Sequence, residues 1–256
     1  MQKTRSRTAV LLLCLFAILS GGCFKSSAKA EKVSAKTALN EAVKFFDEQT
    51  SIKAKYTHSV QEGNYMSVYR SEINADKLSG TTKESIVKQI IKDGTPIAEE
   101  TSENWYYDNG NGTRDIYISG AVKDTWNSFS KNTEKAIFDD LNFPAILQEG
   151  NKTGYTSIDA GYSQGVITIT GSLKTPSILS IEDVLERKSE NQGYVWKTAI
   201  NVDSKTFRPL SVEISNKNEM ISIRYLSYGE TFDTAIPAVE TPSVEHPVPV
   251  EPAKNE

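Results

Sequence analysis

The chain has 256 residues, of which 29 are lysine or arginine and 33 are aspartate or glutamate, so its formal net charge is −4. It has no run of five or more basic residues, which argues against a nucleic-acid partner and against electrostatic docking on anionic lipid. Two cysteines and two histidines are too few for a disulfide framework, and a zinc site would have to draw most of its ligands from carboxylates. We therefore expect no cofactor and no metal.

The first 22 residues are typical of a secretory signal. Lys3, Arg5 and Arg7 precede an apolar run of 11 residues, 9–19, and the small residues 20–22 follow it. The alternative, a membrane-spanning helix, needs about 20 apolar residues. The pattern predicts export and removal of residues 1–22.

A cysteine follows these small residues directly. The stretch LSGGCF, Leu19–Phe24, resembles a bacterial lipobox, although Ser20 stands where that motif usually has leucine. The resemblance implies cleavage before Cys23 and attachment of acyl chains, such as palmitate, to that residue; two chains anchor a protein stably. We therefore expect a lipoprotein held at the cell membrane on its extracytoplasmic face, with 26 basic and 33 acidic residues left in the mature chain. The alternative is ordinary cleavage that leaves a free thiol.

Composition also sets the limits of the folded domain. Residues 23–33 are small and charged, and they fit a tether between the lipid and the domain. Residues 237–256 hold five of the nine prolines and no aromatic residue, which predicts an extended tail that is either solvated or read by a partner as a polyproline segment. Residues 34–236 are then one domain.

The domain is predicted to begin with a helix. Its apolar residues recur at spacings of three and four, and Ser34 can cap its N-terminus. The stripe consists of Ala35, Ala38, Leu39, Ala42, Val43 and Phe46. Small residues at one end and an aromatic ring at the other favour close packing on a flat surface such as a sheet.

Strands follow this helix. Apolar and polar residues alternate with a period of two from Ile52 to Val60, and further strands are predicted at Tyr65–Asn74, Ser85–Lys92, Glu103–Asp108 and Arg114–Ser119. Ser85–Lys92 also fits a helix, but the Asp93-Gly94 pair after it indicates a tight hairpin and favours a strand.

The second half mixes helices and strands. Helices are expected at Asn132–Leu147, broken at Pro144, and at Pro176–Lys188; strands are expected at Gly165–Gly171, Tyr194–Val202, Leu210–Ser215 and Met220–Tyr228. The fold class that follows is α+β, with helices on one side of a curved antiparallel sheet.

Three features carry a resemblance to the LolA-like superfamily of lipoprotein carriers and envelope lipid-binding lipoproteins. They are the helix before the first strand, the aromatic hairpin NWYYDNGNGTRDIYI followed by Trp126, and the late hairpin YVWKTAINVDSKTFRPLSVEIS. The resemblance spans most of the domain, but its motifs are degenerate. It implies an open, strongly curved half-barrel with helices across the concave face, and a face that accepts acyl chains or another apolar segment.

Residues that could carry chemistry are few. His246 lies in the tail, and His58 alternates with Tyr56 and Val60, which indicates a histidine that is hydrogen-bonded or half-exposed. No H-E-x-x-H motif is present, and the one G-x-S-x-G match, Gly161–Gly165, leads into the strand predicted at Gly165–Gly171 and not into the helix that follows a nucleophile elbow. The loop Asp108–Thr113 has glycines where calcium ligands should stand, which favours a hairpin turn over a calcium site. We therefore expect no enzyme.

The expected function is binding or carriage of a hydrophobic ligand in a concave apolar cleft. The ligand would be a lipid, an acyl chain or the lipid part of a lipoprotein. The residues predicted to line the cleft are Tyr56, Trp105, Tyr107, Ile116, Ile118, Trp126 and Phe129. Each could instead be ordinary core. Two alternatives stay open: an interaction module that presents a sheet edge or the tail to an envelope protein, and a hydrolase with an unrecognised site.

Overall fold

The structure is a computed structural model, and it describes residues 33–120, 125–133, 135–145, 147–148, 158–173 and 196–237. The chain divides into two compact units, Met1–Val33 and Ser34–Glu256, and the description below concerns the second. The expected signal, Cys23, nearly all of the tether, the helix at 176–188 and all but the first residue of the tail lie outside the described residues.

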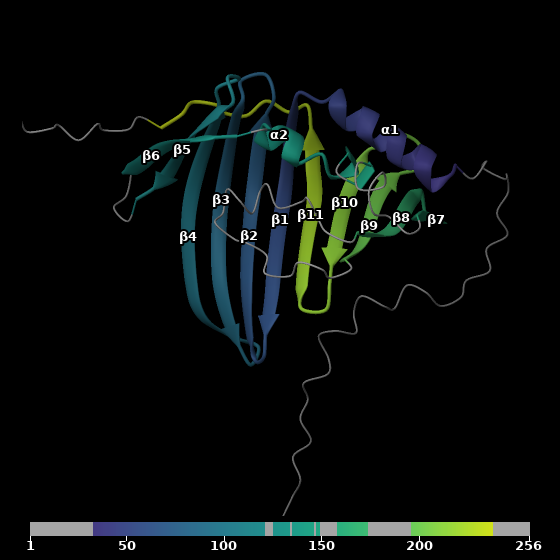
Figure 1. Cartoon of the computed structure of the whole chain (residues 1–256), viewed down its shortest axis with the longest axis horizontal. Helices are drawn as coiled ribbons and strands as arrows, with labels where there is room; N and C mark the ends of the chain where they lie inside the picture. The colour runs from purple at the N-terminus through teal and green to yellow at the C-terminus, as the bar shows by residue number, and fades with distance from the viewer. Residues whose placement is uncertain are drawn as a thin grey trace, which may run out of the picture. The chain divides into compact units, whose positions relative to one another are not determined.

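In the described part of the chain, eleven strands form one antiparallel sheet in the order β6-β5-β4-β3-β2-β1-β11-β10-β9-β8-β7 (Figure 1). The strands of the first half are β1 Ser51–Glu62, β2 Tyr65–Asp76, β3 Thr81–Lys92, β4 Thr95–Asp108, β5 Thr113–Ser119 and β6 Trp126–Asn132. Those of the second half are β7 Ile158–Ser163, β8 Val166–Leu173, β9 Trp196–Asp203, β10 Pro209–Ser215 and β11 Glu219–Tyr228. The sheet consists of two meanders joined by the pairing of β1 with β11, and it is not closed, because β6 and β7 are its outer strands.

The first helix, α1, spans Ala35–Asp47. Its N-cap is Ser34, whose Oγ accepts a hydrogen bond from the amide of Thr37 at 3.1 Å, as the sequence predicts. Five of the six residues of the predicted stripe are buried, and Val43 is half-buried. Phe46 lies with its ring centroid 6.0 Å from that of Tyr225 on β11, so the helix packs on the sheet.

The second helix, α2, is a single turn, Ile137–Asp140, on the same face of the sheet. The ring of Phe138 lies 5.5 Å from that of Phe46, and the next residue after the helix, Leu141, accepts a hydrogen bond at 2.8 Å from the hydroxyl of Tyr225. The face of the sheet that carries Tyr225 is called the helix-covered face below, and the other is called the opposite face.

Register places residues on these faces. Directly paired residues in an antiparallel sheet point to the same side. From Tyr225, one row on the helix-covered face runs through Ala54, Ile73, Glu84, Asn104 and Ile118. The neighbouring row contains Ile223, Tyr56, Ser71, Ile86 and Ser102.

Two strands were not predicted, and one helix is shorter than predicted. Trp126–Asn132 and Ile158–Ser163 are the outer strands β6 and β7, and both are mostly polar or glycine-containing. The range 132–147 begins with the last residue of β6, and its described helical residues are α2, 143–145 and 147. The range is interrupted at 141–142, next to Pro144 as predicted, and Pro144 itself lies in the first turn of the second helical piece, where its missing N–H removes no helical bond.

Candidate functional site

A buried polar cluster lies on the helix-covered face of β2, β3 and β4. It is called the Glu84 cluster and consists of Tyr69, Ser71, Glu84, Asn104 and Tyr106. The two oxygens of the Glu84 carboxylate, which is 3% exposed, each accept a tyrosine hydroxyl at 2.8 Å, from Tyr69 and Tyr106. Burial, and then the Glu84 charge, raise the pKa of both tyrosines above the ordinary value, so the hydroxyls stay protonated and continue to donate.

Two buried atoms of this cluster have no hydrogen-bond partner among the residues that the structure describes. They are the hydroxyl oxygen of Ser71 and the side-chain oxygen of Asn104, whose amide nitrogen donates to Tyr106 at 2.9 Å. Ser71 and Asn104 are only 5% and 8% exposed. A buried polar atom without a partner is costly, and such atoms are typically satisfied by an ordered water or by a polar group of a ligand.

The surroundings of the Glu84 cluster are apolar. The ring of Tyr56 lies 5.9 Å from that of Tyr69, edge to face, and Ile73 and Ile86 are buried beside the cluster. Tyr106 also belongs to an apolar group with Ile116, Ile137 and Ile118. The site therefore offers unsatisfied hydrogen-bonding atoms inside an apolar wall, which suits a molecule with a polar head and an apolar body.

The seven predicted lining residues do not share one face. Tyr56, Ile116, Ile118 and Phe129 lie on the helix-covered face, and Trp105, Tyr107 and Trp126 lie on the opposite face. Trp105 packs there among charges, with its indole N–H donating to Glu103 at 3.0 Å and the Lys83 ammonium 4.9 Å from its ring. Lining of the ligand site stays a prediction for the four residues on the helix-covered face. The seven residues cannot all line one cavity, because three of them lie on the opposite face.

The sequence analysis missed the polar members of the cluster. Ser71 and Glu84 stand at positions that alternate with outward-facing residues, in step with the buried Ile73 and Ile86. A polar residue in phase with apolar core residues is the signal that could have identified them.

His58 is a hydrogen-bonded buried histidine, as predicted. Its Nε2 lies 2.6 Å from a carboxylate oxygen of Glu219, and both side chains are 4% exposed. The pair links β1 to β11, the junction of the two meanders, so its evident role is structural.

A small cavity lies between α1 and the sheet. The cavity beneath α1, between Leu39 and Ile169, has a volume of about 10 Å³, which is at most one water. This cavity is too small for a long apolar ligand.

The glycine-rich loop is a hairpin turn, as predicted. The Asp108 carboxylate is engaged by Arg114 at 2.6 Å and by the amide of Ile137 at 3.0 Å. Over the described ranges, no group of three or more histidine, cysteine, aspartate or glutamate side chains is placed to hold a metal ion. Within the same ranges, no helix has both the length and the apolar character that crossing a membrane requires.

Comparison with known proteins finds solved structures of similar fold. No protein-family model and no curated protein matches the chain. The fold is that of the LolA-like lipoproteins of mycobacteria, which confirms the resemblance at the level of fold. LprF from Mycobacterium bovis is similar over 80% of this chain and 97% of its own, with a TM-score of 0.50 and 11% identity. Lipoprotein LppX from Mycobacterium tuberculosis matches over 78% of this chain and 98% of its own, with a TM-score of 0.49 and 8% identity.

Proposed function

We propose that this protein is a lipid-anchored, extracytoplasmic lipoprotein that binds a hydrophobic ligand on the helix-covered face of its sheet, without covalent chemistry. The anchor is the acylated Cys23 predicted from the sequence. The open sheet is a curved half-barrel whose helices lie across the concave face. The fold shared with LprF supports this proposal.

The observation that carries the proposal is the pair of unpartnered atoms in the Glu84 cluster. Ser71 can donate to a ligand, and the Asn104 oxygen can accept from one. The Glu84 carboxylate next to them disfavours an anionic head group. The ligand is therefore an amphiphile with an uncharged hydroxyl- or ester-bearing head, and its apolar body gains about 25 cal/mol for each Å² removed from water.

The test is native mass spectrometry of the mature protein after gentle extraction, followed by uptake of a fluorescent diacylglycerol. Co-purifying lipid and uptake are expected. Ser71→Leu, which fills the site with an apolar side chain, should abolish both. The matched control is Ser222→Leu, a half-buried serine on the opposite face of β11. Thermal unfolding of both variants separates loss of binding from loss of fold, and repeated absence of lipid from the folded wild-type protein would reject the proposal.

A second candidate function is an envelope interaction module, which the outer strand β6 favours. Phe129 on this strand is 50% exposed, and β6 has no strand partner on its outer side among the described residues. An exposed aromatic on an unpaired edge suits addition of a partner strand. Loss of a co-purifying envelope protein in Phe129→Ser, with lipid uptake unchanged, would favour this candidate.

A further inference from the structure

The opposite face of the sheet has a hollow of about 460 Å³ across β1 to β4. The side chains that line it include Lys55 and Thr57 of β1, Arg70 and Glu72 of β2, Val87 of β3 and Thr101 of β4. Tyr56, Ser71 and Ile86 also border it, but their side chains are buried on the helix-covered face, so they contribute backbone. The hollow is therefore separate from the Glu84 cluster, on the other side of the same strands.

The carboxylates of the hollow are already paired. Glu72 accepts from Lys53 at 2.7 Å, and Glu103 accepts from Lys83 at 2.9 Å. Both lysines lie outside the hollow, and their ion pairs neutralise the two carboxylates. The acidic side chains of the hollow therefore offer no free charge to an incoming group.

The cations of the hollow have no carboxylate partner within the described ranges. Lys55 forms no ion pair among the described residues, and the guanidinium of Arg70 donates to the neutral side chain of Gln89 at 2.5 Å. In register, Lys55 and Arg70 lie on adjacent strands two positions apart, so one carboxylate can reach both. The hollow therefore favours an anion, and the aliphatic parts of Val87 and the threonines favour a small apolar body around it.

The chain itself contains a segment with this chemistry. Residues 238–256 hold four glutamates and one lysine, interleaved with valines and prolines, as in VEHPVPVEP at 244–252. Such a segment combines carboxylates with small, rigid apolar side chains, and proline lowers the conformational entropy lost on docking.

The path of the chain makes the hollow reachable from this segment. After β11, the amide of Gly229 donates to the carbonyl of Ser51 at 3.0 Å, and the Ser51 hydroxyl donates to the carbonyl of Glu230 at 2.6 Å. These bonds hold the chain after β11 beside the start of β1, the strand that carries Lys55. From residue 238 to residue 252, an extended chain of about 3.5 Å per residue spans about 50 Å.

We propose that the acidic valine- and proline-rich segment 240–252 docks in the hollow on the opposite face, with one glutamate between Lys55 and Arg70. The hollow is thus a site for an acidic peptide, supplied by the same chain. This assignment is independent of the ligand proposed for the helix-covered face, because the two sites use opposite sides of β1 to β4.

The test uses residues 34–256, the second compact unit, which contains no cysteine. A nitroxide is attached to Val248→Cys, and the amide signals of the isotope-labelled protein are recorded by NMR. Signals of Thr57, Arg70, Val87 and Thr101 should lose intensity. The loss should shrink in high salt, since the screening length falls from about 10 Å at 0.1 M to about 3 Å at 1 M ionic strength.

Charge reversal supplies the control. The double variant Lys55→Glu/Arg70→Glu should restore these signals, whereas Lys36→Glu/Lys44→Glu, on exposed positions of α1, should leave the loss unchanged. The proposal would be overturned if the signals at the hollow kept their intensity, or if reversing the charges of Lys55 and Arg70 left the loss of intensity unchanged. Dodecanoate, a fatty acid, is also added to a chain that ends at residue 237, and the chemical shifts of the same four amides are recorded. If dodecanoate changes these shifts while the spin label in the longer chain leaves the four signals at full intensity, the occupant is a lipid carboxylate and the proposal is wrong.

Discussion

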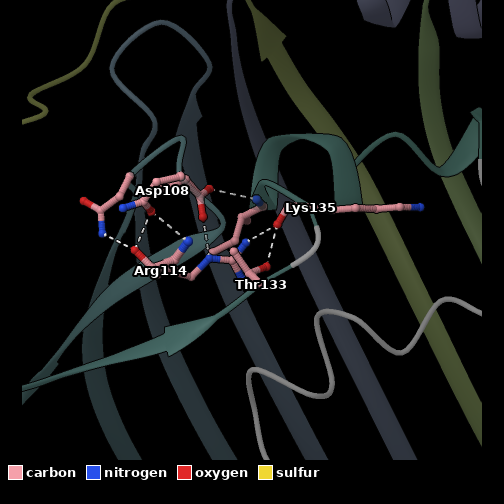
Figure 2. Close-up of polar contacts among 8 residues, drawn as sticks. Asp108, Arg114, Thr133 and Lys135 are labelled. Carbon is pink, nitrogen blue, oxygen red and sulfur yellow. Dashed lines mark hydrogen bonds and ion pairs between the residues drawn. The ribbon is translucent and has the colours of Figure 1, made fainter.

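The Nε atom of Arg114 lies 2.6 Å from a carboxylate oxygen of Asp108, and the Arg114 side chain is 1% exposed (Figure 2). The same guanidinium donates to the carbonyl of Lys135 at 2.7 Å, while the second Asp108 oxygen accepts the amide of Ile137 at 3.0 Å. The pair therefore fixes the start of α2 to the β4–β5 hairpin. Because α2 covers part of the helix-covered face, the shape of that face depends on these bonds.

Arg114→Leu should lower the free energy of unfolding by about 3–5 kcal/mol, because it leaves the Asp108 charge partly buried and uncompensated. Urea denaturation measures this change. The control is Arg224→Leu, at an exposed position on the opposite face of β11, where a change within about 0.5 kcal/mol is expected. Equal effects of the two substitutions would show that the buried pair does not hold the hairpin.

Gly80 is required by both its backbone and its neighbour. Its φ is +69°, and a Cβ there would lie 2.7 Å from the carbonyl oxygen of Asp108, whose amide donates to the carbonyl of Gly80 at 2.9 Å. Gly63 has a similar φ, +62°, but a Cβ at that position would have no other atom within 4 Å. Gly63→Ala should cost about 1 kcal/mol of stability, for the left-handed backbone alone. Gly80→Ala should lower the free energy of unfolding distinctly more, because its Cβ would also clash with the Asp108 carbonyl. Thermal unfolding measures both variants, and an equal fall in melting temperature would show that this close contact has no effect.

The elements that the sequence predicted are those set by local chemistry. The Ser34 cap, the period of two from Ile52 and the Asp93-Gly94 turn each depend on a few adjacent residues. Asp93 and Gly94 have φ of +49° and +80°, which a two-residue hairpin turn requires. The apolar pattern of residues 85–92 fits a helix as well as a strand. The Asp93-Gly94 turn signal favoured the strand, and the structure confirms it.

The elements that it missed are set by distant partners. β6 and β7 have weak strand propensity of their own and are held by pairing with β5 and β8. Alternation shows that Trp105 and Tyr106 point to opposite sides, but only the positions of α1 and α2 decide which side is covered. For this reason the predicted lining was divided between two faces, and the Glu84 cluster went unrecognised.

Buried tyrosines should make the fold sensitive to alkali. Burial is the main cause that raises the pKa of Tyr69, Tyr106, Tyr225 and Tyr228 above the ordinary value of about 10. The unfolded chain then releases these protons first, so stability is fully present below about pH 10 and falls as the pH rises above it. Urea denaturation from about pH 8 to about pH 11 measures the slope, up to about 1.4 kcal/mol per pH unit for each tyrosine.

Tyr225→Phe isolates one of these contributions. It removes one titrating group, so the fall in stability above about pH 10 should become less steep by one proton. At neutral pH it should cost about 1 kcal/mol, because the hydrogen bond to the carbonyl of Leu141 is lost. An unchanged alkaline slope would mean that Tyr225 reaches solvent before the chain unfolds.

Ser71→Ala separates the cost of an unpaired hydroxyl from its use by a ligand. The Ser71 hydroxyl has no partner in the structure, so its removal breaks no bond and should leave the free energy of unfolding unchanged or raise it by about 1 kcal/mol. If this hydroxyl donates to the lipid head, binding of a diacylglycerol should weaken by about 3–10-fold. Ser59→Ala, on the opposite face of β1, should change neither quantity. A loss of stability in Ser71→Ala would show that the hydroxyl is bonded within the protein, and unchanged binding would remove Ser71 from the proposed site.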